Sequence, residues 1–196
     1  AASAGAAEPL PPAVQRYEEV PFSLALPEGA APGDELPVVV YAGGTWQVHK
    51  GHLSFEIVGE LVRAGYAVAN FVPQFHFPRA EYTDEQIVNY TFNYLNPASG
   101  RSVLRQQAAE AIYFVRVLEA LSGPDQLPRL DVARPMYLRH SQGSLAGALV
   151  AAASDDYIAY GFNGLGSYTS VTVVERKDIM DIERLVRDVV GAERPL

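Results

Sequence analysis

The residues best suited to chemistry lie where a predicted strand meets a predicted helix, in the run Tyr137-Leu138-Arg139-His140-Ser141-Gln142-Gly143-Ser144. A sharp strand-to-helix turn lifts the Oγ of a serine above the edge of a sheet, and the first N–H groups of the helix can stabilise an oxyanion that forms there. Gly143 is the small residue that such a turn needs, whereas Arg139 is not. The spacing therefore predicts a nucleophile at Ser141, and the alternative is a polar turn that only caps the helix.

An alternation of strands and helices would position this turn. Apolar or alternating runs predict strands at 17–27, 37–41, 66–72, 135–138 and 157–162. Helical periodicity predicts helices within 53–66, 102–121, 142–154 and 178–191. A strand, a helix and a strand in succession imply a parallel pair joined by a right-handed crossover. The chain is therefore predicted to be an α/β protein with a doubly wound, mostly parallel sheet.

A Pro-, Asn- and Tyr-rich insertion at 73–99 interrupts this rhythm and is predicted to be a loop. Together with Phe71 just before it, the insertion contains seven aromatic side chains: Phe71, Phe75, Phe77, Tyr82, Tyr90, Phe92 and Tyr94. An apolar substrate needs an apolar pocket, so the insertion would suit a lid or an acyl-chain wall over Ser141. The alternative is a long loop that its aromatic side chains hold against the body of the domain.

The composition excludes several classes of protein. With 196 residues, of which 48% are hydrophobic and 19% charged, we expect one domain over 15–196 after an Ala/Pro-rich tail or linker over 1–14. A net charge of −8 without a dense basic cluster argues against a nucleic-acid partner. The absence of cysteine excludes disulfides, zinc-thiolate sites and a cysteine nucleophile. No transmembrane segment is predicted, and the compartment stays open, with a secreted or periplasmic protein as one option.

Four segments together are similar to one known superfamily. They are the core His140-Ser141-Gln142-Gly143, the strand and loop at 37–44, the strand start at 65–68 and the stretch NPASGRSVLRQ at 96–106. From about Tyr17 to its end the chain resembles the α/β-hydrolases, most closely the branch of bacterial extracellular lipases and virulence-factor-type esterases. It departs from the usual pattern of that branch at Arg139 and Ser144, where glycine is usual, at Ala42 or Gly43, where a loop histidine is usual, and at Ser102, where aspartate is usual.

The resemblance implies a serine hydrolase that acts on lipid-like or small carboxylic esters through an acyl-enzyme on Ser141, without a cofactor. The oxyanion hole would combine the N–H of Gln142 with an N–H of Gly44 or Thr45. The glycines of this loop also have the simpler reading of a tight strand exit. The substrate pocket is predicted to include three aromatic residues: Trp46, Phe75 and Phe77. Trp46 has plain packing as its alternative.

The partners of Ser141 are missing from the expected place. The chain order in α/β-hydrolases is serine, acid, histidine, yet the four histidines all precede Ser141: His49, His52, His76 and His140. Either the acid and the histidine are absent from this chain, so that the domain is incomplete and lacks its last strands, or His76, His49 or His52 acts as the base from a loop on the same face. No acid is assigned, and His140 is expected to pack beside the sheet. A metal site is not predicted, since His49 and His52 have only Glu56 nearby.

A parallel sheet that ends with the strand at 157–162 would have an uncovered hydrophobic edge. A second chain, a dimer or a continuation of the chain would cover it. The alternative to an enzyme is a non-catalytic binding module of the same fold, in which Arg139 marks an elbow without activity and the pocket holds a ligand or a partner.

Overall fold

The computed structural model describes residues 13–14, 17–47, 50–122, 127–166, 175, 177 and 181–191. Most of the predicted tail, His49 and the first residues of the predicted last helix lie outside this part of the chain. The described strands form one five-stranded sheet in the order β1-β3-β2-β4-β5. Their bounds are β1 (Phe22–Ala25), β2 (Glu35–Ala42), β3 (Ala67–Phe71), β4 (Arg129–His140) and β5 (Ala159–Asn163). β1 runs antiparallel to β3 and the other pairs are parallel, so the predicted mostly parallel α/β sheet is confirmed.

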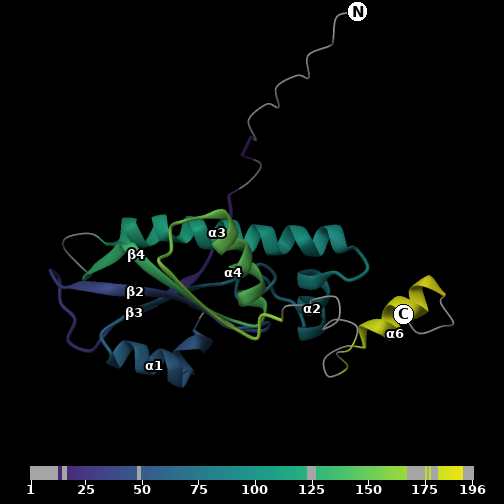
Figure 1. Cartoon of the computed structure of the whole chain (residues 1–196), viewed down its shortest axis with the longest axis horizontal. Helices are drawn as coiled ribbons and strands as arrows, with labels where there is room; N and C mark the ends of the chain where they lie inside the picture. Colours follow the sequence, from purple (N-terminus) through teal and green to yellow (C-terminus); the bar gives the residue numbers. More distant parts are fainter. Residues whose placement is uncertain are drawn as a thin grey trace, which may run out of the picture.

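Helices cover both faces of this sheet (Figure 1). Helices α3 (Pro97–Leu121) and α4 (Gln142–Ala153) lie on one face and α1 (Glu56–Arg63), preceded by the 3-10 turn η1 (Gly51–Ser54), lies on the other. Side chains alternate along a strand. Val38 and Val40 of β2 therefore pack under α3, whereas Tyr41 packs with Val58 of α1. Each fully buried aliphatic side chain of this core contributes about 1.5–3 kcal/mol.

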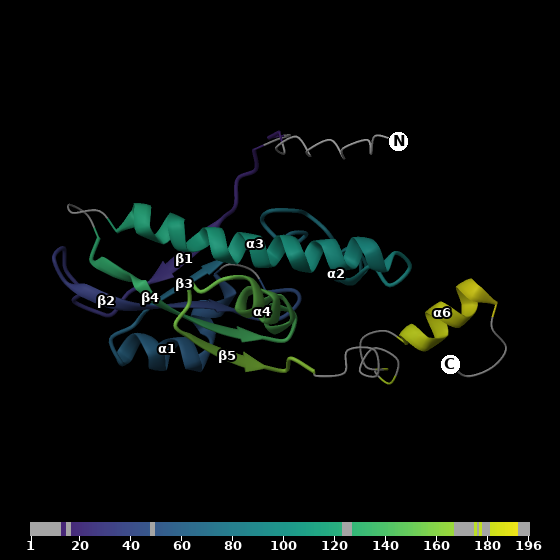
Figure 2. The ribbon, with the colours of Figure 1, turned by 45° about the horizontal axis from the view of Figure 1, so that its top comes forward.

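The insertion contains a helix, so the prediction of a loop over 73–99 was wrong. Helix α2 (Asp84–Phe92) begins at a capping box, in which Thr83 and Gln86 each accept from the other's backbone N–H. α3 also begins earlier than predicted, because Asn96 caps it and Pro97 occupies its first turn. Figure 2 shows α2 beside the start of α3. The two helices pack so closely that a Cβ on Gly100 would lie 2.0 Å from the carbonyl oxygen of Phe92.

A buried ion-pair network holds the insertion against α3. The guanidinium of Arg79, whose side chain is 3% exposed, donates to both carboxylate oxygens of Glu110 and to both of Glu18. It also donates to the carbonyl of Val72, at the end of β3, over 3.2 Å. Burial by itself would lower the pKa of Arg79, but the hydrogen bonds and charges of Glu110 and Glu18 outweigh burial and raise this pKa above its ordinary value.

The remaining elements follow the sequence with altered bounds. β4 begins at Arg129 rather than at 135, because its first half pairs with the start of β2 before a register irregularity between Pro37 and Val39. The predicted strand at 17–27 is confined to β1. The helices predicted within 142–154 and 178–191 are α4 and α6 (Ile182–Val190).

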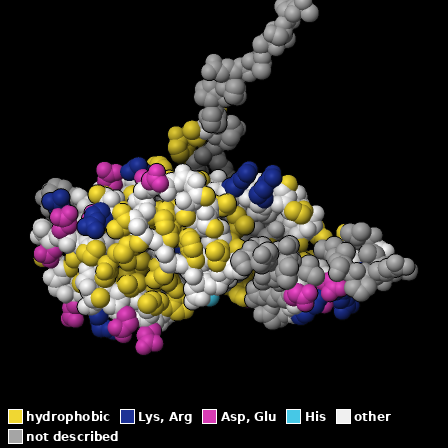
Figure 3. Space-filling model, in the orientation of Figure 1, with side chains coloured by type: hydrophobic (Ala, Val, Ile, Leu, Met, Phe, Trp, Pro, Cys, Tyr) yellow, Lys and Arg dark blue, Asp and Glu magenta, His cyan; other side chains and the backbone are white. Residues whose placement is uncertain are grey.

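β5 pairs only with β4 among the described strands. Figure 3 shows hydrophobic side chains gathered on the side of the molecule that faces the viewer, at the height between α3 and α1 in Figure 1, with charged side chains around them. Exposed Ile158, directly before β5, and Leu149 of α4 are large apolar residues of this part of the molecule. Among the described helices, none is both long and apolar enough to cross a membrane.

Candidate active site

Ser141 occupies a strained turn between β4 and α4. Its φ of 51° and ψ of −119° lie outside the regions that a residue with a side chain prefers. Such a backbone costs about 1–3 kcal/mol and persists only where the surroundings impose it. The N–H of Ser141 donates to the carbonyl of Asn163 in β5 over 2.8 Å, and its own carbonyl accepts from the N–H groups of Ser144 and Leu145. The turn is thus held from the sheet side and from the helix side.

Small residues let α4 lie directly on the sheet. A Cβ on Gly143 would lie 3.0 Å from the carbonyl oxygen of Gly43, and one on Gly147 would lie 2.6 Å from the rings of Tyr137 and Phe162. Ser144, which is fully buried, has its hydroxyl 2.8 Å from the carbonyl oxygen of Arg139 and 3.0 Å from that of Asn163. Its hydroxyl therefore joins the ends of β4 and β5 beside the turn.

The loop after β2 meets this turn. Gly44 approaches so closely that a Cβ on it would lie 3.0 Å from Cβ and 3.4 Å from Oγ of Ser141. Thr45 Oγ1 donates to Oε1 of Gln142, which is buried, over 3.0 Å. The structure therefore brings together Ser141, Gln142, Gly44 and Thr45. Gln142 and Gly143 begin α4, where backbone N–H groups have no intrahelical acceptor. Two N–H groups of the helix are thus available beside the serine.

The three aromatic residues predicted for the substrate pocket have different surroundings. Trp46 follows Thr45 in the same loop, is 40% exposed, and its indole N–H donates to the carbonyl of Asp84 at the start of α2. Phe75 packs with Tyr82 and Tyr90, at ring distances of 6.1 and 5.6 Å. Phe77 is exposed. Phe75, Tyr82 and Tyr90 thus form a cluster, and the pocket role of Trp46, Phe75 and Phe77 stays a prediction.

The histidines lie in different environments. His76 is buried, its Nδ1 lies 2.8 Å from the carbonyl oxygen of Gln74, and its Nε2 has no hydrogen-bond partner among the described residues. Burial lowers the pKa of His76, and the contact with Gln74 opposes this only in part. His52 belongs to η1. His140 is exposed, so its expected packing beside the sheet was wrong: it ends β4, and its ring lies near two glycines, Gly44 and Gly164, that cover little of it.

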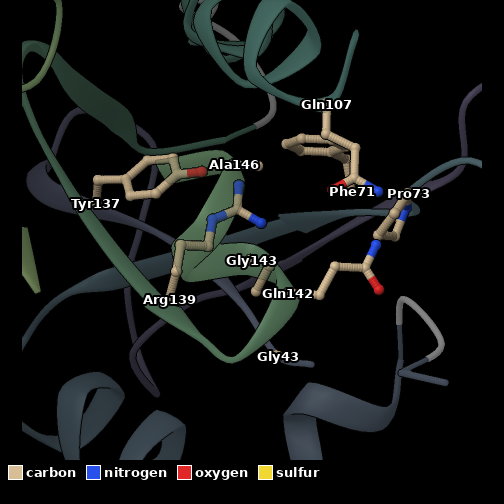
Figure 4. A pocket seen from close by; sticks show the side chains of 10 residues that line it. Gly43, Phe71, Pro73, Gln107, Tyr137, Arg139, Gln142, Gly143 and Ala146 are labelled. Atoms are coloured by element: carbon tan, nitrogen blue, oxygen red, sulfur yellow. The ribbon is translucent and has the colours of Figure 1, made fainter. Parts of the chain in front are cut away.

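We call the turn at Ser141, between β4 and α4, the elbow. A cavity of about 10 Å³ lies under it on the side of α3 (Figure 4). Ten residues line it: Ala42, Gly43, Phe71, Pro73, Gln107, Tyr137, Arg139, Gln142, Gly143 and Ala146. A volume of this size suits a single water-sized particle and is far below what an ester substrate needs. The cavity is therefore too small to be the predicted substrate pocket, and it lies beside Gln142 and Gly143 at the start of α4.

Two buried polar residues of this cavity are absent from the sequence-based site. Arg139 points away from the tight turn, so its size does not disturb it, and its guanidinium lies over the rings of Tyr137 and Phe71 at 4.5 and 5.0 Å. Gln107 of α3 falls on the apolar stripe that contains Val103 and Ala111. A polar residue at that position of the helical period was the signal that could have identified it. Among the described residues, no group of three or more acids and histidines could hold a metal ion.

Comparisons with known proteins give matches only among solved structures. No protein-family model matches the chain, and no curated protein matches it. The chain is similar to a ferulic acid esterase from Streptomyces cinnamoneus, with 22% identity and a TM-score of 0.44 over 65% of this chain and 35% of that one. It is also similar to a cold-adapted esterase from an Arctic intertidal metagenomic library, with 18% identity and a TM-score of 0.48 over 73% of this chain and 54% of that one. The chain therefore spans about a third and about half of the length of these two proteins.

The observed sheet and the turn at Ser141 match the fold class that the sequence predicts. A mostly parallel sheet with helices on both faces, and a serine on a strained turn between a strand and the following helix, form an α/β-hydrolase-like architecture.

Proposed function

We propose that this chain is a serine hydrolase that acts on carboxylic esters, lipid-like or small, through an acyl-enzyme on Ser141. The observation that supports the proposal most directly is the positive φ of Ser141 at the first turn of α4. Backbone strain of this kind is retained where a side chain has to be presented in one direction. A polar turn that only capped α4 would accept a backbone N–H with its hydroxyl, and Ser141 makes no such side-chain capping bond.

In the proposed reaction, Ser141 Oγ attacks the carbonyl carbon of the ester while its proton passes to a general base. The negative charge that develops on the carbonyl oxygen is stabilised by the N–H of Gln142 and an N–H of Gly44 or Thr45. The carbon–oxygen bond to the alcohol breaks, the alcohol leaves with a proton, and water then hydrolyses the acyl-serine. The hydrogen bond from Thr45 to the side chain of Gln142 supports this assignment, because it fixes the two donor segments relative to each other.

The proposal includes two alternatives for the general base. In one, an acid and a histidine from outside the residues present complete the triad. In the other, His76, His49 or His52 accepts the proton. Because burial lowers the pKa of His76, its ring is neutral at neutral pH, which is the state that a base requires.

The test compares the wild type with Ser141→Ala and with Ser102→Ala as the matched control. Ser102 is an exposed serine of α3 whose hydroxyl donates only to the carbonyl of Ala98. Labelling by a fluorophosphonate measures nucleophilicity, and a burst of nitrophenolate from a p-nitrophenyl ester measures acylation. We expect label and burst from the wild type and from Ser102→Ala, and neither from Ser141→Ala.

Equal traces from the wild type and Ser141→Ala would overturn the proposal and favour the non-catalytic binding module. The same assays on His76→Gln separate the two alternatives for the base. Loss of the burst in that variant supports His76, and an unchanged burst supports a base from elsewhere.

A further inference from the structure

We propose that the cavity under the elbow binds one monoatomic anion of the chloride class, held by Arg139 and Gln107. This site would be a structural anion site beside Gln142 and Gly143 at the start of α4. It does not depend on the proposed function, because the two side chains that would hold the anion, Arg139 and Gln107, do not contact an ester in that proposal.

Arg139 is the first reason to expect an anion. The residue is 3% exposed, and its Nε and Nη2 have no hydrogen-bond partner among the described residues. The rings of Tyr137 and Phe71 attract the positive charge through their faces, but neither side chain carries a negative charge. A buried cation without a counter-charge is expensive, because removal from water costs several kcal/mol per ion. The guanidinium therefore needs an acceptor that carries negative charge.

Gln107 is the second, independent reason. It comes from α3 on the opposite wall, is 5% exposed, and its Nε2 also has no partner among the described residues. Figure 4 shows the guanidinium of Arg139 in the middle of the lining residues and Gln107 entering from the α3 side. Side chains with unpaired donors from β4 and α3 thus line the same cavity.

The lining and the volume select the class of ligand. None of the ten residues that line the cavity is acidic. The first turn of α4 contributes Gln142 and Gly143 to the same wall, and a helix N-terminus carries a partial positive charge. About 10 Å³ is room for one small particle, so a monoatomic anion such as chloride or bromide suits the cavity better than the larger sulfate or phosphate.

The direct test is the anomalous scattering of bromide in crystals of the wild-type protein grown in sodium bromide. We expect a bromide peak in the cavity, within hydrogen-bond distance of Arg139 and Gln107. A cavity that holds only water, with no anomalous peak at an excess of bromide, would overturn the proposal.

A second test measures the melting temperature while sodium chloride replaces sodium gluconate at constant ionic strength. An anion that binds only the folded state raises Tm, by roughly 3–6 °C at tenfold excess over its dissociation constant. We expect this rise in the wild type and in Arg134→Met, an exposed arginine of the same strand. We expect it to disappear in Arg139→Met and to shrink in Gln107→Met. Equal chloride responses in the wild type and both cavity variants contradict the site, and Gln107→Met keeps the test open if Arg139→Met does not fold.

Discussion

Replacement of Arg79 by methionine should be among the most damaging single changes outside the elbow. The substitution keeps most of the length of the side chain and removes every hydrogen bond to Glu18, Glu110 and the carbonyl of Val72. It leaves two carboxylates facing each other where a cation had separated them. Glu110 is only 14% exposed, so water cannot easily replace the lost partner.

The exposed fractions of these side chains determine the order in which the variants should lose free energy of unfolding. Removal of one partner from a buried ion pair costs about 3–5 kcal/mol, which we expect for Arg79→Met. Glu110→Gln should cost somewhat less, because Glu18 still neutralises Arg79. Glu18 is 38% exposed, so solvent screens its contribution, and Glu18→Gln should cost about 1 kcal/mol or less. The matched control is Arg116→Met. Its partners Glu119 and Asp156 lie 3.8 and 3.3 Å away, and its side chain is 59% exposed, so the substitution should cost about 1 kcal/mol or less.

Urea unfolding followed by circular dichroism measures these differences without the added salt that guanidinium chloride brings. With a denaturant slope of about 2 kcal/mol per molar, Arg79→Met should lower the urea midpoint by roughly 1.5–2.5 M. The double variant Arg79→Met with Glu110→Met should lose less stability than the sum of the single variants. If Arg79→Met lowered the midpoint no more than Arg116→Met does, the reasoning from burial would be refuted.

Two further predictions concern the elbow and His76. Ser144→Ala removes the hydroxyl between the carbonyls of Arg139 and Asn163, and should cost about 1–3 kcal/mol in urea unfolding, whereas Ser102→Ala should change stability by less than about 0.5 kcal/mol. Equal losses from the two alanine variants would show that the buried hydroxyl does not hold the strand ends. Burial lowers the pKa of His76 below its ordinary value of 6.5, so the unfolded chain binds a proton more readily than the folded one, and stability falls as the pH drops below about 6.5. His76→Gln should therefore lose less Tm than the wild type between about pH 7.5 and about pH 5.5, and parallel losses would contradict the assignment.

The core strands could be predicted from the sequence because a strand that is buried on both faces has a continuous run of apolar residues. PVVVY and YAVANFV are continuous apolar runs, and they became β2 and β3. The first half of β4 had no such run, because only Leu130 of its first six residues is buried and its ladder is interrupted opposite Pro37. α2 had a readable start in Thr83 and Gln86, which the many aromatic residues of the insertion obscured.

The candidate site likewise contains residues that could be predicted from the sequence and residues that could not. Local spacing predicted a nucleophile at Ser141, and the resemblance added Gln142, Gly44 and Thr45. The structure brings these four residues together, and their roles stay predictions. The side chain of Arg139 could not be placed, because which face of β4 it joins depends on the register and on the aromatic rings that receive it. Arg139, which stands where glycine is usual in the branch that the chain resembles, therefore affects the cavity under the turn and not the conformation of the turn.

The hydrogen bond from Trp46 to Asp84 gives the molecule a built-in optical reporter. The chain has one tryptophan, and it lies one residue after Thr45 in the loop that meets the elbow, joined by its indole to the start of α2. Indole emission depends on solvent contact, so its wavelength follows the separation of that loop from α2. A molecule that binds between the loop and α2 is therefore detectable in the unlabelled protein, by a shift in the emission wavelength of Trp46.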